Sequence, residues 1–142
     1  LNILFFSYQE VLLKLYEQIQ LGEHLIIDLS CCNQRLLMNS ECSRDLFFNA
    51  VRDAGLTVVN EGFYKFSPHG FTCFLLLAES HASLHAWPEF GYCAIDLFTC
   101  NLGLDLTPLV QKLQVLFESK HISIRHINRF AVHEKELVLS VC

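Results

Sequence analysis

The chain has 142 residues, of which 52% are hydrophobic and 18% are charged, and its formal net charge is −5. This length is typical of one domain, and the hydrophobic content excludes a disordered chain. The acidic balance argues against a protein that binds nucleic acid. The seven cysteines are odd in number and include no CxxC pair, which favours reduced thiols in a cytoplasmic protein over a disulfide framework or a zinc site.

The first segment of the chain has a helical pattern, with apolar side chains at positions 4, 8, 11, 12, 15 and 19 and polar side chains between them. This spacing predicts an amphipathic helical extension over residues 1–21, ahead of a main domain over residues 22–142. The segment is too polar for a membrane span and lacks the basic start of a signal peptide. We therefore expect no association with a membrane.

The main domain is expected to combine an antiparallel sheet with two helices. The predicted elements are a strand over 24–32, a helix over 43–54, strands over 57–66, 71–78, 80–87 and 92–99, a helix over 106–120, and strands over 123–130 and 136–141. Ser43 and Thr107 are the expected N-caps of the two helices, and Gly55 ends the first of them. Because short turns join consecutive strands, the sequence predicts an α+β fold, a two-layer α/β sandwich with the helices packed on one face of the sheet.

Residues 79–89 concentrate side chains that can carry out chemistry, among them Ser80, His81, His85 and Glu89. A serine hydrolase would use Ser80 with a histidine, but the Gly-x-Ser-x-Gly elbow is missing. A metal site of His81, His85 and Glu89 would need a helix, because side chains four residues apart on a strand lie roughly 13 Å apart. The same side chains also fit an ordinary strand without a catalytic role, so the residue types alone leave these interpretations open.

A longer pattern separates the interpretations. Residues 79–100 read Glu-Ser-His-x-x-x-His-x-Trp-Pro-Glu-x-Gly-Tyr-x-Ala-Ile-Asp-Leu-Phe-Thr-Cys, and this run resembles the bacterial and archaeal S-adenosylmethionine decarboxylases. Upstream, Phe-Tyr-Lys-Phe at 63–66 and Pro-x-Gly at 68–70 resemble the strand and turn that precede the cut site of that family. The similarity begins near residue 24 and leaves residues 1–21 outside. It implies the same antiparallel sheet backed by helices.

The resemblance implies a proenzyme that cuts itself between Glu79 and Ser80. In the family, the serine hydroxyl attacks the preceding glutamate carbonyl, the resulting ester undergoes β-elimination, and the chain splits. The products here would be a β chain of residues 1–79 and an α chain of residues 80–142 that starts with a pyruvoyl group made from Ser80. That cofactor forms a Schiff base with the substrate amine and takes up the negative charge left by decarboxylation.

The resemblance also implies roles in processing and catalysis. His85 matches the histidine that removes a proton during the elimination. Thr72 stands where the family usually has a serine that steadies the oxyoxazolidine intermediate, and it keeps the hydroxyl but adds a methyl group that stiffens the side chain. Cys100 matches the residue that returns a proton to the α-carbon of the substrate.

Three residues are expected to contact the substrate. Phe66 matches an aromatic residue that stacks on adenine, Glu89 matches the carboxylate that binds the ribose hydroxyls, and Glu79 becomes a new C-terminus that lines the pocket. No role is implied for His81. Short members of the family form homodimers with shared active sites, so one chain would supply Glu79, Ser80 and Cys100, and the other Phe66, Thr72, His85 and Glu89.

The expected activity is decarboxylation of S-adenosylmethionine to the aminopropyl donor for spermidine synthesis. One alternative keeps the pyruvoyl chemistry but acts on ornithine or arginine, and His69, where the family turn often has tyrosine, is a reason to consider it. The other alternative is a non-catalytic paralogue that binds or regulates a partner, for which the extension over residues 1–21 is the best support. The intact Glu79–Ser80 pair with His85 and Cys100 favours an enzyme.

Overall fold

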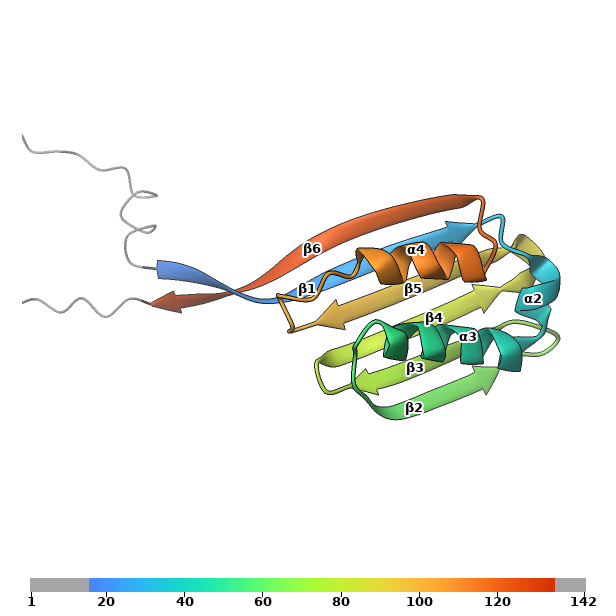
Figure 1. Cartoon of the computed structure of the whole chain (residues 1–142), viewed down its shortest axis with the longest axis horizontal. Helices are drawn as coiled ribbons and strands as arrows, with labels where there is room; N and C mark the ends of the chain where they lie inside the picture. Colours follow the sequence, from blue (N-terminus) through green and yellow to red (C-terminus); the bar gives the residue numbers. More distant parts are fainter. Residues whose placement is uncertain (1–15, 135–142) are drawn as a thin grey trace, which may run out of the picture.

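The computed structural model describes residues 16–134, which form a two-layer α+β sandwich (Figure 1). Six antiparallel strands make one sheet in the order β2-β3-β4-β5-β1-β6. The elements are β1 (Tyr16–Ser30), α2 (Gln34–Met38), α3 (Ser40–Asp53), β2 (Val58–Lys65), β3 (Phe71–Leu77), β4 (Ser80–Trp87), a 3-10 turn (Pro88–Phe90), β5 (Tyr92–Thr99), α4 (Thr107–Leu116) and β6 (His121–Glu134). The predicted antiparallel sheet with helices on one face is confirmed.

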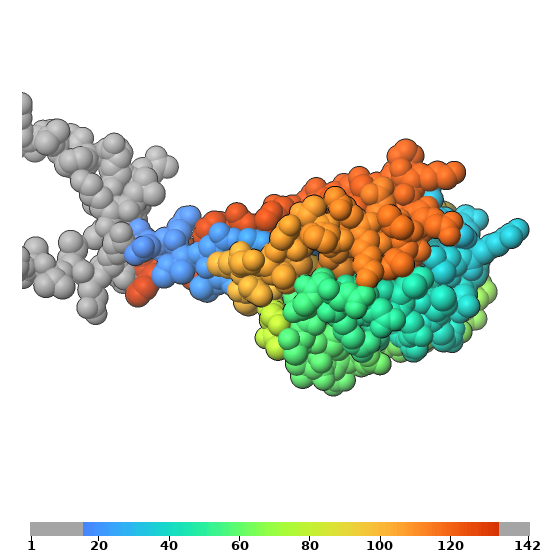
Figure 2. Space-filling view, in the orientation of Figure 1, coloured from blue at the N-terminus to red at the C-terminus, as the bar shows by residue number. Residues whose placement is uncertain are grey.

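The core lies between the sheet and helices α3 and α4. Alternate side chains of the strands are buried there, as Leu84 and Ala86 of β4 illustrate, and Phe47 of α3 and Leu113 of α4 pack into the same cluster. Side chains of the two helices close over this face of the sheet (Figure 2). The opposite face is covered by no described helix, and it carries half-buried polar side chains such as His85. We call this second surface the open face.

The N-terminal prediction needs a correction. Residues 16–21 are not helical but form the first part of β1, where Gln20 lies opposite Phe130 of β6. The two strands run as a ribbon beyond the rest of the sheet (Figure 1). Hydrogen bonds to a distant strand have overridden the local helical spacing, as tertiary pairing often does. The rest of the predicted helix, residues 1–15, and the strand predicted over 136–141 lie outside the described residues.

The helix starts also differ from the prediction. Helix α3 begins before Ser43, because Asn39 is its N-cap and the Asn39 Oδ1 accepts a hydrogen bond from Cys42 N–H at 3.3 Å. Thr107 is the first residue of α4 rather than its cap, and its N–H donates to Asp105 Oδ1 at 2.9 Å. The five-residue helix α2 was not predicted, since it is too short to show a periodic pattern.

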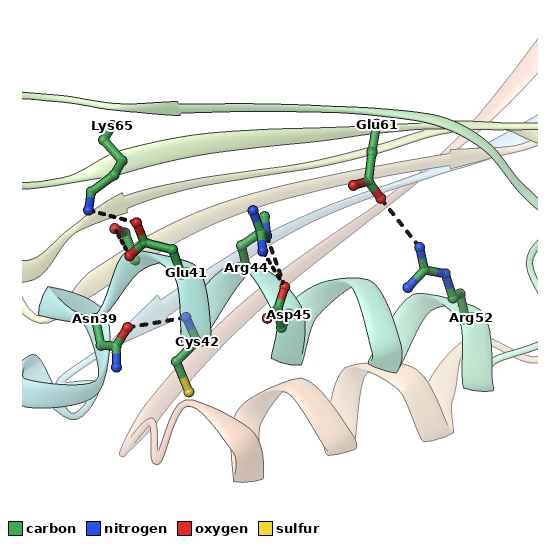
Figure 3. Close-up of polar contacts among 9 residues, drawn as sticks. Asn39, Glu41, Cys42, Arg44, Asp45, Arg52, Glu61 and Lys65 are labelled. Atoms are coloured by element: carbon green, nitrogen blue, oxygen red, sulfur yellow. Dashed lines mark hydrogen bonds and ion pairs between the residues drawn. The ribbon is translucent and has the colours of Figure 1, made fainter.

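Exposed ion pairs connect α3 to the edge strand β2 (Figure 3). Lys65 Nζ lies 2.8 Å from Glu41 Oε1, and Arg52 Nη2 lies 3.3 Å from Glu61 Oε2. Exposed pairs of this kind each stabilise a fold by at most about 1 kcal/mol. The buried core therefore holds the two layers together, and the ion pairs add little.

Candidate active site

The predicted site residues gather at the two ends of strand β4. Ser80 is the first residue of the strand, and His85 lies five positions further along it. At about 3.3 Å per residue, the two side chains start from Cα atoms about 17 Å apart. One protomer therefore contains two separate clusters, which we call the Ser80 end and the His85 end.

The Ser80 end begins with a two-residue turn, Ala78-Glu79, that joins β3 to β4. Ser80 pairs with Thr99 at the end of β5, and this register brings the next residue, Cys100, beside the turn. The backbone N–H of Cys100 donates to the carbonyl oxygen of Glu79 at 2.9 Å. The carbonyl group that the prediction marks for attack is thus already held by a hydrogen bond.

Two further features mark the bond between Glu79 and Ser80. Ser80 has a φ angle of 151°, a conformation that side-chain-bearing residues rarely adopt and that stores backbone strain. The Glu79 carboxylate accepts a hydrogen bond from Thr57 N–H at 3.0 Å, and this bond lowers the pKa of Glu79. Cys100 is exposed, so its thiol is accessible at the same end.

The His85 end is built from β3, β4 and the segment that joins β2 to β3. Thr72 lies directly opposite His85 in the β3–β4 register, and its hydroxyl donates to the Leu84 carbonyl at 3.4 Å. The ring of His85 lies between those of Phe66, with centroids 5.2 Å apart, and Trp87, with centroids 4.0 Å apart. Burial among these groups lowers the pKa of His85, which favours the neutral imidazole that can accept a proton.

A cavity of about 380 Å³ opens at the His85 end. Its lining combines aromatic rings with one carboxylate: Phe66, Ser67, Pro68, His69, Gly70, His85, Ala86, Trp87 and Glu89. His69 Nε2 lies 3.4 Å from Glu89 Oε2. At Gly70, φ is 94° and an added Cβ would come 3.0 Å from the Ala86 carbonyl oxygen, so only glycine fits this turn. The cavity suits a flat ring with a polar group near Glu89.

Other parts of the described chain add nothing to the predicted site. A cavity of about 400 Å³ lies between α4 and strands β1 and β6, but none of the predicted residues lines it. Within residues 16–134, no three histidine, cysteine or acidic side chains are grouped so that they could hold a metal ion. No helix in that range is long and apolar enough to cross a membrane.

The structure reveals contacts that the sequence did not indicate. These are the Cys100 N–H on the Glu79 carbonyl, the Thr57 N–H on the Glu79 carboxylate, the pairing of His69 with Glu89, and a contact between Ser80 and His81. The first two come from backbone groups, which no side-chain pattern can reveal. The other two involve His69 and His81, for which the resemblance implied no role in the site.

Comparisons with known proteins agree on one family. The family model of S-adenosylmethionine decarboxylase matches residues 23–130. The S-adenosylmethionine decarboxylase proenzyme of Thermodesulfovibrio yellowstonii is 35% identical over 109 residues, which are 77% of this chain and 81% of that protein. The proenzyme of the same name from Methanococcus vannielii is 34% identical over 119 residues, or 84% of this chain and 98% of that protein.

A solved structure supports the same conclusion. The crystal structure of the adenosylmethionine decarboxylase from Aquifex aeolicus matches with a TM-score of 0.68 and 32% sequence identity, covering 87% of this chain and 97% of that chain. The fold is thus that of a carboxy-lyase whose relatives are made as proenzymes. The chain belongs to the S-adenosylmethionine decarboxylase family. The predicted resemblance and fold class are confirmed, and the individual roles of the residues remain predictions.

Proposed function

We propose that this protein cuts itself between Glu79 and Ser80 and then decarboxylates S-adenosylmethionine. The observation that carries the proposal is the geometry of the Glu79–Ser80 bond. Its carbonyl oxygen accepts the Cys100 N–H at 2.9 Å, and Ser80 has a strained φ angle of 151°. The hydrogen bond continues the β4–β5 ladder, but the strained φ angle is uncommon in a strand, and strain of this kind supports the proposal that the adjoining bond reacts.

The first step is attack by the Ser80 hydroxyl on the Glu79 carbonyl carbon. Negative charge then develops on the carbonyl oxygen, where the Cys100 N–H already points and can strengthen its hydrogen bond. Collapse of the intermediate breaks the Glu79–Ser80 amide and leaves an ester. Conversion of the strained amide to an ester also releases the strain at Ser80.

The second step needs the His85 end of another protomer. Within one chain His85 starts about 17 Å from Ser80, too far for proton transfer at position 80. We propose a homodimer in which the open faces meet, so that the Ser80 end of one protomer lies against the His85 end of its partner. Apolar side chains on this face support the contact, because Phe74, Leu76 and Ile127 are each 43% exposed.

Elimination of the ester then separates the two pieces of the chain. The neutral imidazole of His85 from the partner subunit removes the proton from the Ser80 α-carbon, the bond from the Ser80 β-carbon to the ester oxygen breaks, and Glu79 departs as a new carboxylate. The dehydroalanine left at position 80 tautomerises to an imine, which takes up water and loses ammonia to give the pyruvoyl group. The Thr72 hydroxyl, opposite His85 in the sheet, would hydrogen-bond the processing intermediate from the same side. The lowered pKa of His85 supports this role, because the base must be unprotonated before it acts.

The mature site would combine both ends. The pyruvoyl group at position 80 supplies the carbonyl that takes up the charge left by departing CO2. The cavity at the His85 end holds the nucleoside, with Phe66 against adenine and Glu89 on the ribose hydroxyls. The exposed Cys100 thiol beside position 80 holds the proton that returns to the substrate carbon. The residues at both ends therefore fit the group that Ser80 would provide.

The product would serve as the aminopropyl donor for spermidine synthesis. We place this reaction in the cytoplasm, where thiols stay reduced, since all six cysteines of the described residues are free. One observation favours a different substrate with the same chemistry. Glu89 faces His69 at 3.4 Å, and a carboxylate in that position can also bind the side-chain cation of ornithine or arginine.

Intact mass of the purified protein tests the cut. We expect two chains, residues 1–79 and a second chain that begins with pyruvoyl at position 80. Ser80→Ala should stay whole, and Ser83→Ala, a matched hydroxyl on the same strand, should still split. A single wild-type chain that does not react with a carbonyl reagent would refute the proposal and favour a non-catalytic paralogue.

Release of CO2 then identifies the substrate. The cut protein is supplied separately with carboxyl-labelled S-adenosylmethionine, ornithine and arginine. We expect label to be released from S-adenosylmethionine alone. Release from either of the other amino acids would reassign the cavity at the His85 end to a smaller, cationic substrate.

A further inference from the structure

His81 follows Ser80 directly, and the family resemblance implies no role for it. Its Nδ1 atom lies 3.2 Å from the Ser80 hydroxyl oxygen. On a regular strand, neighbouring side chains point to opposite faces of the sheet. The φ angle of 151° at Ser80 departs from that regular geometry, and the hydroxyl meets the imidazole. The contact is therefore a specific product of the strained backbone at the cut site.

The His81 ring is held in place by aromatic neighbours. Phe74 of β3 stacks on it with ring centroids 5.9 Å apart and planes 22° apart, and Phe98 of β5 lies 5.8 Å away. His24 of β1 contacts its edge, with centroids 6.4 Å apart, and is in turn 3.2 Å from Asp96 through its Nε2 atom. These contacts from three strands restrict the ring, so the direction of Nδ1 toward Ser80 is fixed by packing.

We propose that His81 is the catalytic base of the first processing step, the attack of Ser80 on the Glu79 carbonyl. This proposal rests on the self-cleavage proposed above. In the neutral ring with its proton on Nε2, Nδ1 is an acceptor and the Ser80 hydroxyl donates to it. A hydroxyl is a weak nucleophile until an adjacent base takes its proton, and the 3.2 Å separation is within reach of that transfer.

The step balances without any added reactant. The bond between Ser80 Oγ and the Glu79 carbonyl carbon forms while the hydroxyl proton passes to Nδ1 of His81. The bond from the same carbon to the Ser80 nitrogen then breaks, and Nδ1 returns its proton to that nitrogen. The products are an ester and an amine, and His81 ends in the form in which it began.

The geometry divides the processing reaction between two histidines. His81 touches Ser80 of its own chain, whereas His85 starts about 17 Å further along the strand from Ser80. The base for ester formation therefore comes from the same protomer as Ser80, whereas the base for elimination comes from the partner. A protein that lacks His85 should stop at the ester, and a protein that lacks His81 should not reach it.

Hydroxylamine distinguishes these two blocks, because it cleaves esters readily and amides poorly. The probe is hydroxylamine itself, added to freshly purified wild-type protein, His85→Asn, His81→Gln and His81→Phe, with chain masses followed over time. His81→Phe keeps an aromatic ring in the stack on Phe74 and removes the base. His126→Gln is the matched control, since it changes a histidine of the same sheet that pairs with Glu23 and belongs to neither end of β4.

We expect His85→Asn to remain whole in buffer but to split at residue 79 in hydroxylamine. Both His81 variants should form ester, and hence split, at least about 100-fold more slowly than wild type in either condition. His126→Gln should split like wild type. Circular dichroism of each variant checks that the sheet has formed. In a further variant, His81→Ala, added imidazole should restore splitting.

Splitting of the folded His81→Phe or His81→Gln protein at the wild-type rate would overturn the role of His81 and leave self-cleavage standing. The same holds if His81→Ala splits at the wild-type rate without imidazole. A wild-type protein that never splits and never yields to hydroxylamine would remove the self-cleavage proposal, and the role of His81 with it.

Discussion

The two ends of strand β4 differ in kind. The Ser80 end holds groups that act on covalent bonds: a hydroxyl, an imidazole at 3.2 Å and a carbonyl oxygen held by a backbone N–H at 2.9 Å. The His85 end holds a cavity of about 380 Å³ with aromatic walls and a carboxylate. In our proposal the Ser80 end supplies the bond that reacts, and the His85 end supplies both the elimination base and the substrate cavity. Because the strand separates the two ends by about 17 Å, we propose that neither completes a site within its own chain.

This separation has a physical origin in the strand itself. Between the two ends, β4 alternates regularly, with Ala82 and Leu84 buried under the helices and Ser83 half-buried on the open face. Hydrogen bonds to β3 on one side and β5 on the other fix the strand along its length. Because these hydrogen bonds keep the strand extended, we propose that a second protomer brings the two ends together.

Mixing two inactive variants offers the strongest test of this comparison. Ser80→Ala lacks the attacking hydroxyl, His85→Asn lacks the base for elimination, and each alone should remain uncut. When the two are co-expressed with distinct tags, about half of the dimers formed by random pairing are mixed, and each has one intact site. We expect the His85→Asn chain to split in those dimers, as measured by the mass of each tagged chain.

The control is mixing after separate purification under conditions where dimers do not exchange. Splitting should then be absent. If co-expression also yields no split chain while both variants fold, the two ends do not cooperate between protomers, and the shared site is wrong.

Glu89→Gln tests substrate binding in the cavity at the His85 end. A hydrogen bond to a charged partner stabilises a complex by about 1.5–3 kcal/mol, so KM for S-adenosylmethionine should rise about 10-fold to 100-fold. Splitting at Glu79 should be unchanged, because Glu89 takes part in neither step of the proposed processing. Phe90→Ala is the matched control from the same turn, since Phe90 is 73% exposed and does not line the cavity. A Glu89→Gln protein with wild-type KM would contradict the proposed contact between Glu89 and the ribose.

A smaller effect is expected in the pH dependence of the free energy of unfolding, which should reflect His85 at its end of β4. Burial lowers the pKa of His85 below its ordinary value of 6.5, so below that value the unfolded chain binds a proton that the folded chain resists. The free energy of unfolding should therefore fall as the pH falls through about 6.5 and level off below the lowered pKa of His85. Urea unfolding across this range, in the uncut Ser80→Ala background, should show the decline, and adding His85→Asn should remove it. An identical pH dependence in both proteins would contradict the assignment.

The smallest effect is expected away from both ends. Arg52→Gln breaks the exposed pair between α3 and Glu61 of β2 (Figure 3). The free energy of unfolding should fall by about 0.2–1 kcal/mol in urea, with splitting and KM unchanged. A large loss of splitting, or a large rise in KM, would mean that the helix layer, and not β4 alone, sets the positions of the two ends.

Much of the sheet could be predicted from the sequence. The bounds of strands β4 and β5 were predicted correctly, because alternating apolar residues are interrupted at Pro88 and Gly91. Residues 16–21 were assigned wrongly, since their spacing fits a helix and only the distant partner β6 makes them a strand. The N-cap of α3 moved from Ser43 to Asn39, because several polar residues near that start could fill the role, and the N-cap of α4 moved by one residue, from Thr107 to Leu106.

The candidate site was less accessible to prediction. Matching residues to the family suggested roles for Ser80, His85 and Cys100, and the strand predicted over 80–87 already separated the first two, but neither could reveal the backbone contacts around them. Alternation along β4 would send His81 away from Ser80, so their contact depends on a backbone angle that side-chain patterns do not encode. The Cys100 N–H on the Glu79 carbonyl depends on the register between β4 and β5.

The order of the strands bears on what happens after a cut at residue 79. Strands β1, β2 and β3 belong to the first piece and β4, β5 and β6 to the second, yet in the sheet β1 lies between β5 and β6. The two pieces are thus interlocked, joined along three of the five neighbouring strand pairs. Neither can leave without tearing β1 out of the middle of the sheet. After a cut at residue 79, hydrogen bonds between strands would still hold the two pieces together. Since neither piece contains a complete sheet, the whole chain must fold before the cut is made.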